Sequence, residues 1–298
     1  MIPGIGLRAG ALKTSEDGKY ITGSVYSGTL YVSSDYTRSF VSREYARNWT
    51  LIAMSGDGKY QTATGAGMYI YVSADFGVTW ATKYTSATWF GIAMSLSGQY
   101  QTLSSTTGVY VSSNFGATWT QTSTLNCYGM AMSGTGQIQL TRSSSYDILK
   151  STDYGQTWTA TWSGYWYQMV GISASIDTTY QTYLGYYGQI YVSSNSGASF
   201  TAKESAREWQ MASVSLSGQY QAAVALNAQI YVSTDFGATW AAKESARVWQ
   251  SVAVSGTGKY MVASVSNGYV YISADFGQTW TQGPAYANWR GVAISRAI

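Results

Sequence analysis

Ser73–Trp80, with the sequence Ser-Ala-Asp-Phe-Gly-Val-Thr-Trp, decides how this chain folds, because the same pattern returns along its whole length. Its third position recurs seven times, at intervals of 40, 39, 39, 42, 40 and 40 residues. The residues at this position are Asp35, Asp75, Asn114, Asp153, Asn195, Asp235 and Asp275. Self-similarity at a period of about 40 residues indicates a repeat architecture.

Each copy has the chemistry of a tight turn between two strands. The Asp or Asn side chain accepts hydrogen bonds from nearby backbone amides, and the glycine two residues later supplies the positive φ that closes the turn. An aromatic residue, Trp80 in the second copy, then opens the next strand and buries a large face. The pattern resembles the Asp-box, or BNR, repeat of sialidase-like β-propellers, and the resemblance covers essentially the whole chain. The first copy is degenerate, with Thr37 where glycine is expected.

In that family the box is an outer turn of the blade, so the resemblance implies a shape and no particular reaction. The strand pattern of the second copy agrees with a blade. Trp49–Ser55 is expected to be a first strand, Lys59–Thr64 a second, Met68–Ser73 a third, and Thr79 to about Lys83 a fourth. Four short antiparallel strands per repeat is the pattern of a propeller blade, and seven copies predict an all-β, seven-bladed propeller.

Two columns of residues support this arrangement. The first strands carry a small residue two places before their final Ser, as a narrow central channel would require. Gln follows the start of the second strand in five copies, where a hydrogen bond between blades is a better explanation than a ligand contact. These glutamines are Gln61, Gln101, Gln139, Gln181 and Gln221.

The ends of the chain predict how the ring closes. Residues 289–295 repeat the first-strand pattern fully, whereas Ala9–Ser15 places Lys13 in the small column. We therefore expect residues 1–298 to form one domain that is closed by strand 289–295, with residues 1–14 as an accessory segment.

Composition narrows the chemistry. The chain has 298 residues, 32 Gly, 27 Tyr and only two Pro, which is typical of strands and turns. Charged residues make up 10% and the net charge is +3, which argues against a nucleic-acid surface. The absence of His and the single Cys127 exclude His-dependent triads, His-ligated zinc and an internal disulfide. We expect no metal and no cofactor.

No apolar run approaches the roughly 18 residues of a membrane helix, and Met1–Gly18 lacks the pattern of a secretory signal. Membrane insertion is therefore not expected. An extracellular, virion or cell-surface location is favoured over others, and the oligomeric state is not evident from the residues.

Candidate binding residues lie in the segments before each first strand, where propeller ligands usually sit; we call this side the loop face. Three segments share an acid, an arginine and an aromatic at fixed spacing: Glu44, Arg47 and Trp49; Glu204, Arg207 and Trp209; and Glu244, Arg247 and Trp249. An aromatic plane covers the apolar face of a sugar, while Arg and Glu bond its hydroxyls. The alternative is that each Glu and Arg form a local ion pair and that each Trp caps the core.

Other tryptophans extend this set. The segment that ends at Trp89 keeps Lys83 and the Trp but loses the Glu and Arg, and the segment that ends at Trp289 keeps little beyond the Trp. Trp162 and Trp166 lie in an aromatic segment that departs from the repeat. Tyr183, Tyr186 and Tyr187 follow in the sequence. This segment is either an exposed binding patch or an insertion that packs on itself.

The resemblance to sialidases implies a catalytic set that this chain does not reproduce. It would need an arginine cluster, a Tyr–Glu pair and an acidic Asp from non-equivalent blades, but several arginines here occupy equivalent positions and the Arg-Ile-Pro segment is missing. Sialidases are also usually six-bladed. The acids outside boxes and turns are chiefly Glu44, Glu204, Glu208 and Glu244, of which three are copies of one position.

We therefore expect no catalytic residues and a non-catalytic module for lectin-like carbohydrate recognition or adhesion, since repeated sites are typical of multivalent binders. The alternative is a structural propeller that binds protein surfaces, as a virion or cell-surface component. A glycoside hydrolase is the third possibility.

Overall fold

The computed structural model describes residues 9–25, 27–163, 169–289 and 291–295, and these residues form antiparallel β-strands and turns without a helix. The chain divides into two units, Met1–Ala160 and Thr161–Ile298. No helix in the described part of the chain has the length and apolar character needed to cross a membrane.

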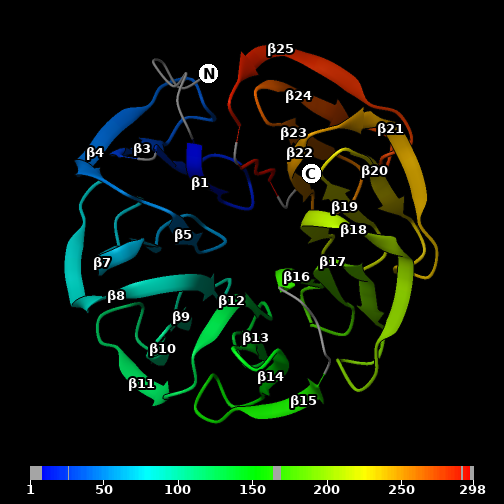
Figure 1. The fold of residues 1–298 in the computed structure, drawn as a ribbon. Helices are drawn as coiled ribbons and strands as arrows, with labels where there is room; N and C mark the ends of the chain where they lie inside the picture. Colours follow the sequence, from blue (N-terminus) through cyan, green and yellow to red (C-terminus); the bar gives the residue numbers. More distant parts are fainter. Residues whose placement is uncertain (1–8, 26, 164–168, 290, 296–298) are drawn as a thin grey trace. The chain divides into compact units, whose positions relative to one another are not determined.

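The first unit is built from strands that follow one another in space as they do in sequence (Figure 1). One sheet has the order β1-β2-β3-β4, a second runs from β5 to β11, and a third begins with β12-β13-β14. The strands are β1 (Ala9–Thr14), β2 (Ile21–Val25), β3 (Gly28–Ser33), β4 (Val41–Arg47), β5 (Leu51–Met54), β6 (Gln61–Thr64), β7 (Ala66–Ser73), β8 (Ala81–Met94), β9 (Gln101–Ser105), β10 (Gly108–Ser112), β11 (Thr120–Ser123), β12 (Cys127–Met132), β13 (Gln139–Ser143) and β14 (Asp147–Ser151), and β15 (Thr159–Ser163) crosses into the next unit.

The second unit repeats the scheme. It contains one sheet from β16 to β21 and one with the order β22-β23-β24-β25. Its strands are β16 (Met169–Ala174), β17 (Gln181–Ser193), β18 (Thr201–Val214), β19 (Gln221–Ala225), β20 (Ala228–Ser233), β21 (Ala241–Arg247), β22 (Trp249–Val254), β23 (Met261–Val265), β24 (Gly268–Ser273) and β25 (Thr281–Ala287).

The core of each unit lies between successive repeats. In the second unit one buried cluster joins Ile230 of β20 to Val252 of β22 and Met261 of β23. In the first unit another joins Leu30 of β3 to Ile52 of β5. One face of each repeat is therefore buried against its neighbour, as stacked repeats require.

Two segments expected to be loops are parts of strands. Residues 81–88 of β8 pair with β7, and residues 89–94 pair with β9, so the fourth strand of one repeat continues into the first strand of the next. β18 spans Lys203–Trp209 in the same way. Register shifts interrupt these strands, and Glu204 adopts a φ of 57°. The chain turns the corner by a β-bulge and not by a free loop, which the prediction from sequence missed.

β1 pairs with β2 at the edge of the first sheet, so the prediction that strand 289–295 replaces Ala9–Ser15 is wrong. In β1, Leu12 lies opposite Gly23 and Thr14 opposite Ile21. Residues 289 and 291–295 are not in a strand, and the amide of Val292 donates to Ser251 Oγ at 3.3 Å.

The turn after β1 explains the error. The amide of Ser15 donates to the carbonyl of Tyr20 at 2.8 Å, and the amide of Tyr20 donates to Ser15 Oγ at 2.9 Å, as at Ser55 and Tyr60 in the next copy. A short turn closes a hairpin at little entropic cost. Lys13 is exposed, so its long side chain does not oppose the pairing. Residues 9–14 therefore belong to the sheet, and the rest of the predicted accessory segment lies outside the described residues.

The predicted hydrogen bonds between repeats are confirmed at four of the five glutamines. Thr62 Oγ1 donates to Gln101 Oε1 at 2.5 Å, while Gln101 Nε2 donates to the carbonyl of Gly98 at 3.0 Å. The same bonding from the preceding repeat reaches Gln61, Gln139 and Gln221. Gln181 differs, because its Oε1 accepts from the hydroxyl of Tyr183 at 3.3 Å.

This pair gives a stability prediction. Gln101→Met should lower the free energy of unfolding by about 1–3 kcal/mol, because the buried Thr62 hydroxyl loses its acceptor. The double variant Thr62→Ala/Gln101→Met should recover most of that loss. It recreates the buried pair Ala222 and Met261, which occupies the same columns in the second unit. Urea denaturation of the four members of the cycle measures the coupling, and additive losses would disprove it.

Candidate functional site

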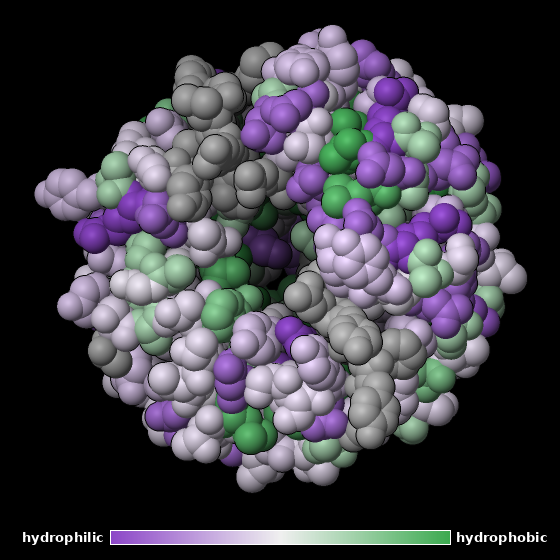
Figure 2. All heavy atoms as spheres, in the orientation of Figure 1, coloured by the Kyte–Doolittle hydropathy of each residue, from purple (hydrophilic) through white to green (hydrophobic). Residues whose placement is uncertain are grey.

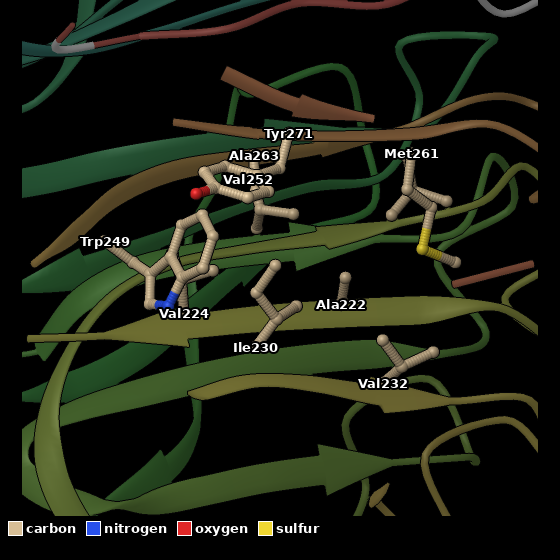
Figure 3. Packing of buried hydrophobic residues seen from close by; sticks show 10 residues of the cluster. Ala222, Val224, Ile230, Val232, Trp249, Val252, Met261, Ala263 and Tyr271 are labelled. Atoms are coloured by element: carbon tan, nitrogen blue, oxygen red, sulfur yellow. The ribbon is translucent and has the colours of Figure 1, made fainter. Parts of the chain in front are cut away.

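The tryptophans expected to face a ligand are core residues. Trp49, Trp209 and Trp249 are completely buried, and Trp89 is 2% exposed. Figure 3 shows Trp249 among Val224, Ile230, Val252 and Tyr271. Trp209 meets Tyr231 edge to face, with ring centroids 5.2 Å apart, and donates from Nε1 to the carbonyl of Gly188 at 3.0 Å. These planes are not available to a sugar.

The arginines of the three segments also pack against tyrosine rings. The guanidinium groups of Arg47, Arg207 and Arg247 lie 5.0, 4.7 and 4.8 Å from the ring centres of Tyr71, Tyr231 and Tyr271. Each tyrosine thus has an arginine and a tryptophan packed on it. This stack ties one repeat to the next.

The glutamates of these segments lie close to the arginines. Glu204 is 3.8 Å from Arg207 and Glu244 is 3.3 Å from Arg247. The equivalent Glu44 and Arg47 form no ion pair within the described residues. The geometry agrees with the alternative of local ion pairs and capping tryptophans, so this motif is a joint between repeats.

The remaining predicted tryptophans do not share one environment. Trp289 is half-buried and donates from Nε1 to the carbonyl of Gly268 at 3.1 Å. Trp162 is half-buried with its ring 4.8 Å from that of Phe200, and Trp166 lies outside the described residues.

The tyrosines that follow this segment divide by exposure. Tyr183 is completely buried, whereas Tyr187 is 61% exposed and packs edge to face on Tyr186. Hydrogen bonding with the carboxylate of Glu208 raises the pKa of Tyr187 to about 12.

The Asp-boxes are turns of the fold, as predicted. Ser73 Oγ donates to Asp75 Oδ1 at 2.8 Å, and Thr79 donates to the same carboxylate from its amide at 2.9 Å and from its hydroxyl at 2.6 Å. The amide of Gly77 donates to Ser73 Oγ at 2.9 Å. The degenerate first copy still closes, with Thr37 at a φ of 72°. Each carboxylate is used within its own turn.

These bonds also set the acidity of the boxes. Bonds from the Thr279 hydroxyl and amide and from Ser273 lower the pKa of Asp275 to about 2. At Asp75, burial acts to raise the pKa, but bonds from Thr79 and Ser73 outweigh it and the pKa is lowered.

A pH dependence follows at Asp275. Because the folded pKa is lowered, the stabilisation is complete above the unfolded pKa of about 3.9 and is lost as the pH falls toward 2. Asp275→Asn should fold well, as Asn195 does in its box, and should flatten the decline of stability between pH 4 and 2. Asp275→Ala should lower the free energy of unfolding by about 1–2 kcal/mol at pH 7, and Asp275→Asn should lower it less. Urea midpoints at pH 7, 4 and 3 measure this, and an unchanged slope in the Asn variant would contradict it.

The free cysteine is not a nucleophile. Cys127 is completely buried and takes the column held by Trp49, Trp89, Trp209 and Trp249 in other copies. Burial raises the pKa of its thiol to about 11, so it stays protonated at neutral pH. Within the residues that the structure describes, no three His, Cys, Asp or Glu side chains come together as metal ligands.

One cationic site was missed by the sequence analysis. The guanidinium of Arg142 lies 4.6 Å from the ring centre of Tyr128 and 5.3 Å from that of Tyr146. The ring of Tyr128 in turn lies 4.7 Å from that of Phe90. The signal available in the sequence was that Arg142 falls in a column that holds Thr64 and Ser104 elsewhere.

Comparisons with known proteins agree with this architecture. The BNR/Asp-box repeat model matches residues 231–242 and 271–282. No curated protein sequence matches the chain.

Several solved structures share its fold. RRP9 WD40 repeats align at a TM-score of 0.70 with 13% identity, covering 89% of each chain. U3-55K aligns at 0.71 with 13% identity, covering 96% of this chain and 95% of that one. YCF48 bound to D1 peptide aligns at 0.60 with 14% identity, covering 82% and 88%. The chain is therefore a β-propeller that carries BNR/Asp-box repeats.

Proposed function

We propose that this propeller is a non-catalytic binding module that holds a segment of a partner protein on its loop face. The observation that carries the proposal is that four of the predicted sugar-binding tryptophans, Trp49, Trp89, Trp209 and Trp249, are buried, while single tyrosines of the loop side are open to solvent. In the first unit Tyr45 is 79% exposed, and in the second unit Tyr187 is 61% and Tyr286 65% exposed. Tyrosine is well suited to protein recognition because it offers a rigid apolar ring with a polar tip.

Figure 2 shows separate hydrophobic patches among polar residues. Interfaces with non-obligate partners are about as apolar as the rest of a protein surface, so the proposed partner does not need a large apolar patch. The YCF48 structure, determined with a peptide bound, is an example of a similar fold that accepts such a ligand.

The absence of catalysis is part of the proposal. All the resolved pKa shifts among described carboxyl groups are downward, whereas a general acid needs a raised pKa. Fluorogenic glycosides should not be turned over. Turnover that Glu204→Gln or Glu244→Gln abolishes would establish a glycosidase instead.

Lectin-like recognition is the second candidate, and the exposed ring of Tyr45 favours it. A sugar could stack on this ring, because the buried tryptophans are not accessible to it. Several weak glycan signals on an array, all lost in Tyr45→Ser, would support this candidate against the first.

A peptide display experiment tests the main proposal. Random peptides selected on the wild-type protein should bind about 10-fold more weakly to Tyr45→Ser, because an exposed aromatic anchor is lost. Val78→Ser is the matched control, since Val78 is exposed in a box turn of the same unit. Selection of no peptide, or equal loss in both variants, would refute binding at the loop face.

We also propose that the repeats form one seven-bladed domain. The support is the seven sequence copies and the repeated strand order within each unit. A closed ring of 298 residues should have a radius of gyration of about 19 Å in small-angle scattering. A clearly larger value would indicate an open stack.

A further inference from the structure

In the fourth repeat, an arginine packed against aromatic rings takes the place of the tryptophan contact that other repeats form. Arg142 of β13 lies opposite Tyr128 of β12, and its guanidinium sits against the rings of Tyr128 and Tyr146. Phe90 of β8 extends the stack beyond Tyr128 and is 37% exposed. These residues come from the ends of β12 and β13 on the loop face, so the stack opens where the proposed partner binds.

The local sequence explains why the arginine is there. Cys127, at the start of β12, is much smaller than the tryptophan of the other copies. The turn after β13 places Tyr146 at a φ of 69°, with its amide donating to the carbonyl of Ser143 at 3.0 Å. The rings and the guanidinium thus form the joint that tryptophan forms elsewhere.

The charge of this arginine is not balanced. Arg207 and Arg247 also stack on tyrosines, and each has a glutamate within 4 Å. Arg47 stacks on Tyr71 without an ion pair to a described residue, but its Nε is buried. Arg142 is half-buried and has neither an ion pair nor a hydrogen bond from its side chain to any described residue. Burial lowers its pKa, which reflects the cost of holding the charge there. The charge of this half-buried group has no acid beside it among the described residues, and a bound anion would supply one.

The donors of Arg142 remain open to a ligand. The central carbon of the guanidinium lies 4.6 and 5.3 Å from the two tyrosine ring centres, and the group carries five N–H donors in a planar fork. The Nε atoms of Arg47, Arg207 and Arg247 are buried without a partner, but no nitrogen of Arg142 is enclosed in this way. A planar fork of this kind matches a carboxylate with two parallel hydrogen bonds.

We infer that Arg142 binds a carboxylate of the partner segment, with Phe90 and Tyr128 packing against an apolar group beside it. The inference rests on the proposed function and names the chemistry of one contact within it. Acidic side chains and a free peptide C-terminus are the two sources of this group.

The test uses the full chain and three sets of random hexapeptides immobilised through their N-termini. The first set has free C-terminal carboxylates and lacks Asp and Glu, the second has the same sequences amidated, and the third is amidated with one internal Asp or Glu. The best acidic peptide should bind about 10–100-fold more tightly than its uncharged partner. Arg142→Gln should remove this advantage, and Arg142→Lys should keep only part of it. Arg38→Gln is the matched control, because Arg38 is an exposed arginine on a box turn of the same unit.

The outcomes separate the two proposals. Peptides that bind equally well with and without a carboxylate would overturn the role of Arg142 and leave the binding module intact. Acidic oligosaccharides that bind through Arg142 when no peptide does would overturn a peptide ligand. If the Arg142 variants do not fold, the wild-type protein decides, because a bound acidic peptide should protect Arg142 from phenylglyoxal more than Arg38. Equal protection of both arginines by the peptide, each compared with its modification in the free protein, would reject the inference.

Discussion

Trp209→Ala should lower the free energy of unfolding by about 3–5 kcal/mol. The side chain is completely buried, it packs on Tyr231, and its Nε1 donates to Gly188. Alanine would leave a large cavity between two repeats and a carbonyl without its donor. Urea denaturation followed by circular dichroism measures the loss.

Two controls decide whether this tryptophan is a core residue. Trp209→Phe should cost clearly less than alanine, because it keeps most of the buried ring and loses the hydrogen bond. Tyr45→Ala, at a side chain that is 79% exposed, should change stability by about 0.5 kcal/mol or less. A Trp209→Ala protein of unchanged stability that no longer bound a ligand would restore the tryptophan to the binding surface.

The box turns were predictable because they are local. Every group that Asp75 needs lies within four residues of it, from Ser73 to Thr79, so the spacing in the sequence contains the geometry. The glutamine column was predictable for a related reason. A polar residue that recurs in a buried strand must have a partner in a neighbouring copy, and Thr62 provides it for Gln101.

The tryptophan segments were misplaced because sequence spacing does not define burial. Glu244, Arg247 and Trp249 are the residues of a sugar site and equally those of a packed joint. The choice between the two depends on Tyr271, which lies 22 residues after Trp249 and packs against both Arg247 and Trp249. A short sequence motif does not reveal contacts between residues so far apart in the sequence.

The site at Arg142 was missed for the opposite reason. Attention to repeated columns favours positions that agree, whereas Arg142 and Cys127 depart from their columns together. Each departure alone has no meaning. The structure brings the arginine within 5.3 Å of two ring centres and places no acid beside it among the described residues, and the proposed carboxylate contact rests on that combination.

Gly98→Ala should destabilise the protein by about 2–4 kcal/mol, for two separable reasons. The residue has a φ of 79°, and a methyl group there costs about 1 kcal/mol in backbone strain. The new Cβ would also lie 2.7 Å from Cβ and Cδ2 of Tyr60, whose ring stacks on Phe115 at 4.5 Å. Because ring and backbone are both held, the clash adds about 1–3 kcal/mol.

Gly67→Ala separates the two costs. Gly67 has a φ of 69° in the same unit, but an added Cβ would meet nothing within 4 Å, so only the backbone term of about 1 kcal/mol should appear. The repeats contain a similar case, since the fifth copy carries Thr178 at the equivalent of Gly98 with a φ of 63°. The copy before it is the one with Ile138 in place of the tyrosine.

A double-mutant cycle completes the test. In a Tyr60→Ala background the clash is gone, so Gly98→Ala should cost no more than Gly67→Ala does. Urea midpoints of the four variants and the wild type give these differences directly. If Gly98→Ala remained as costly without the Tyr60 ring, the glycine would be required by the backbone alone, and the stack of Tyr60 on Phe115 would have no part in selecting it.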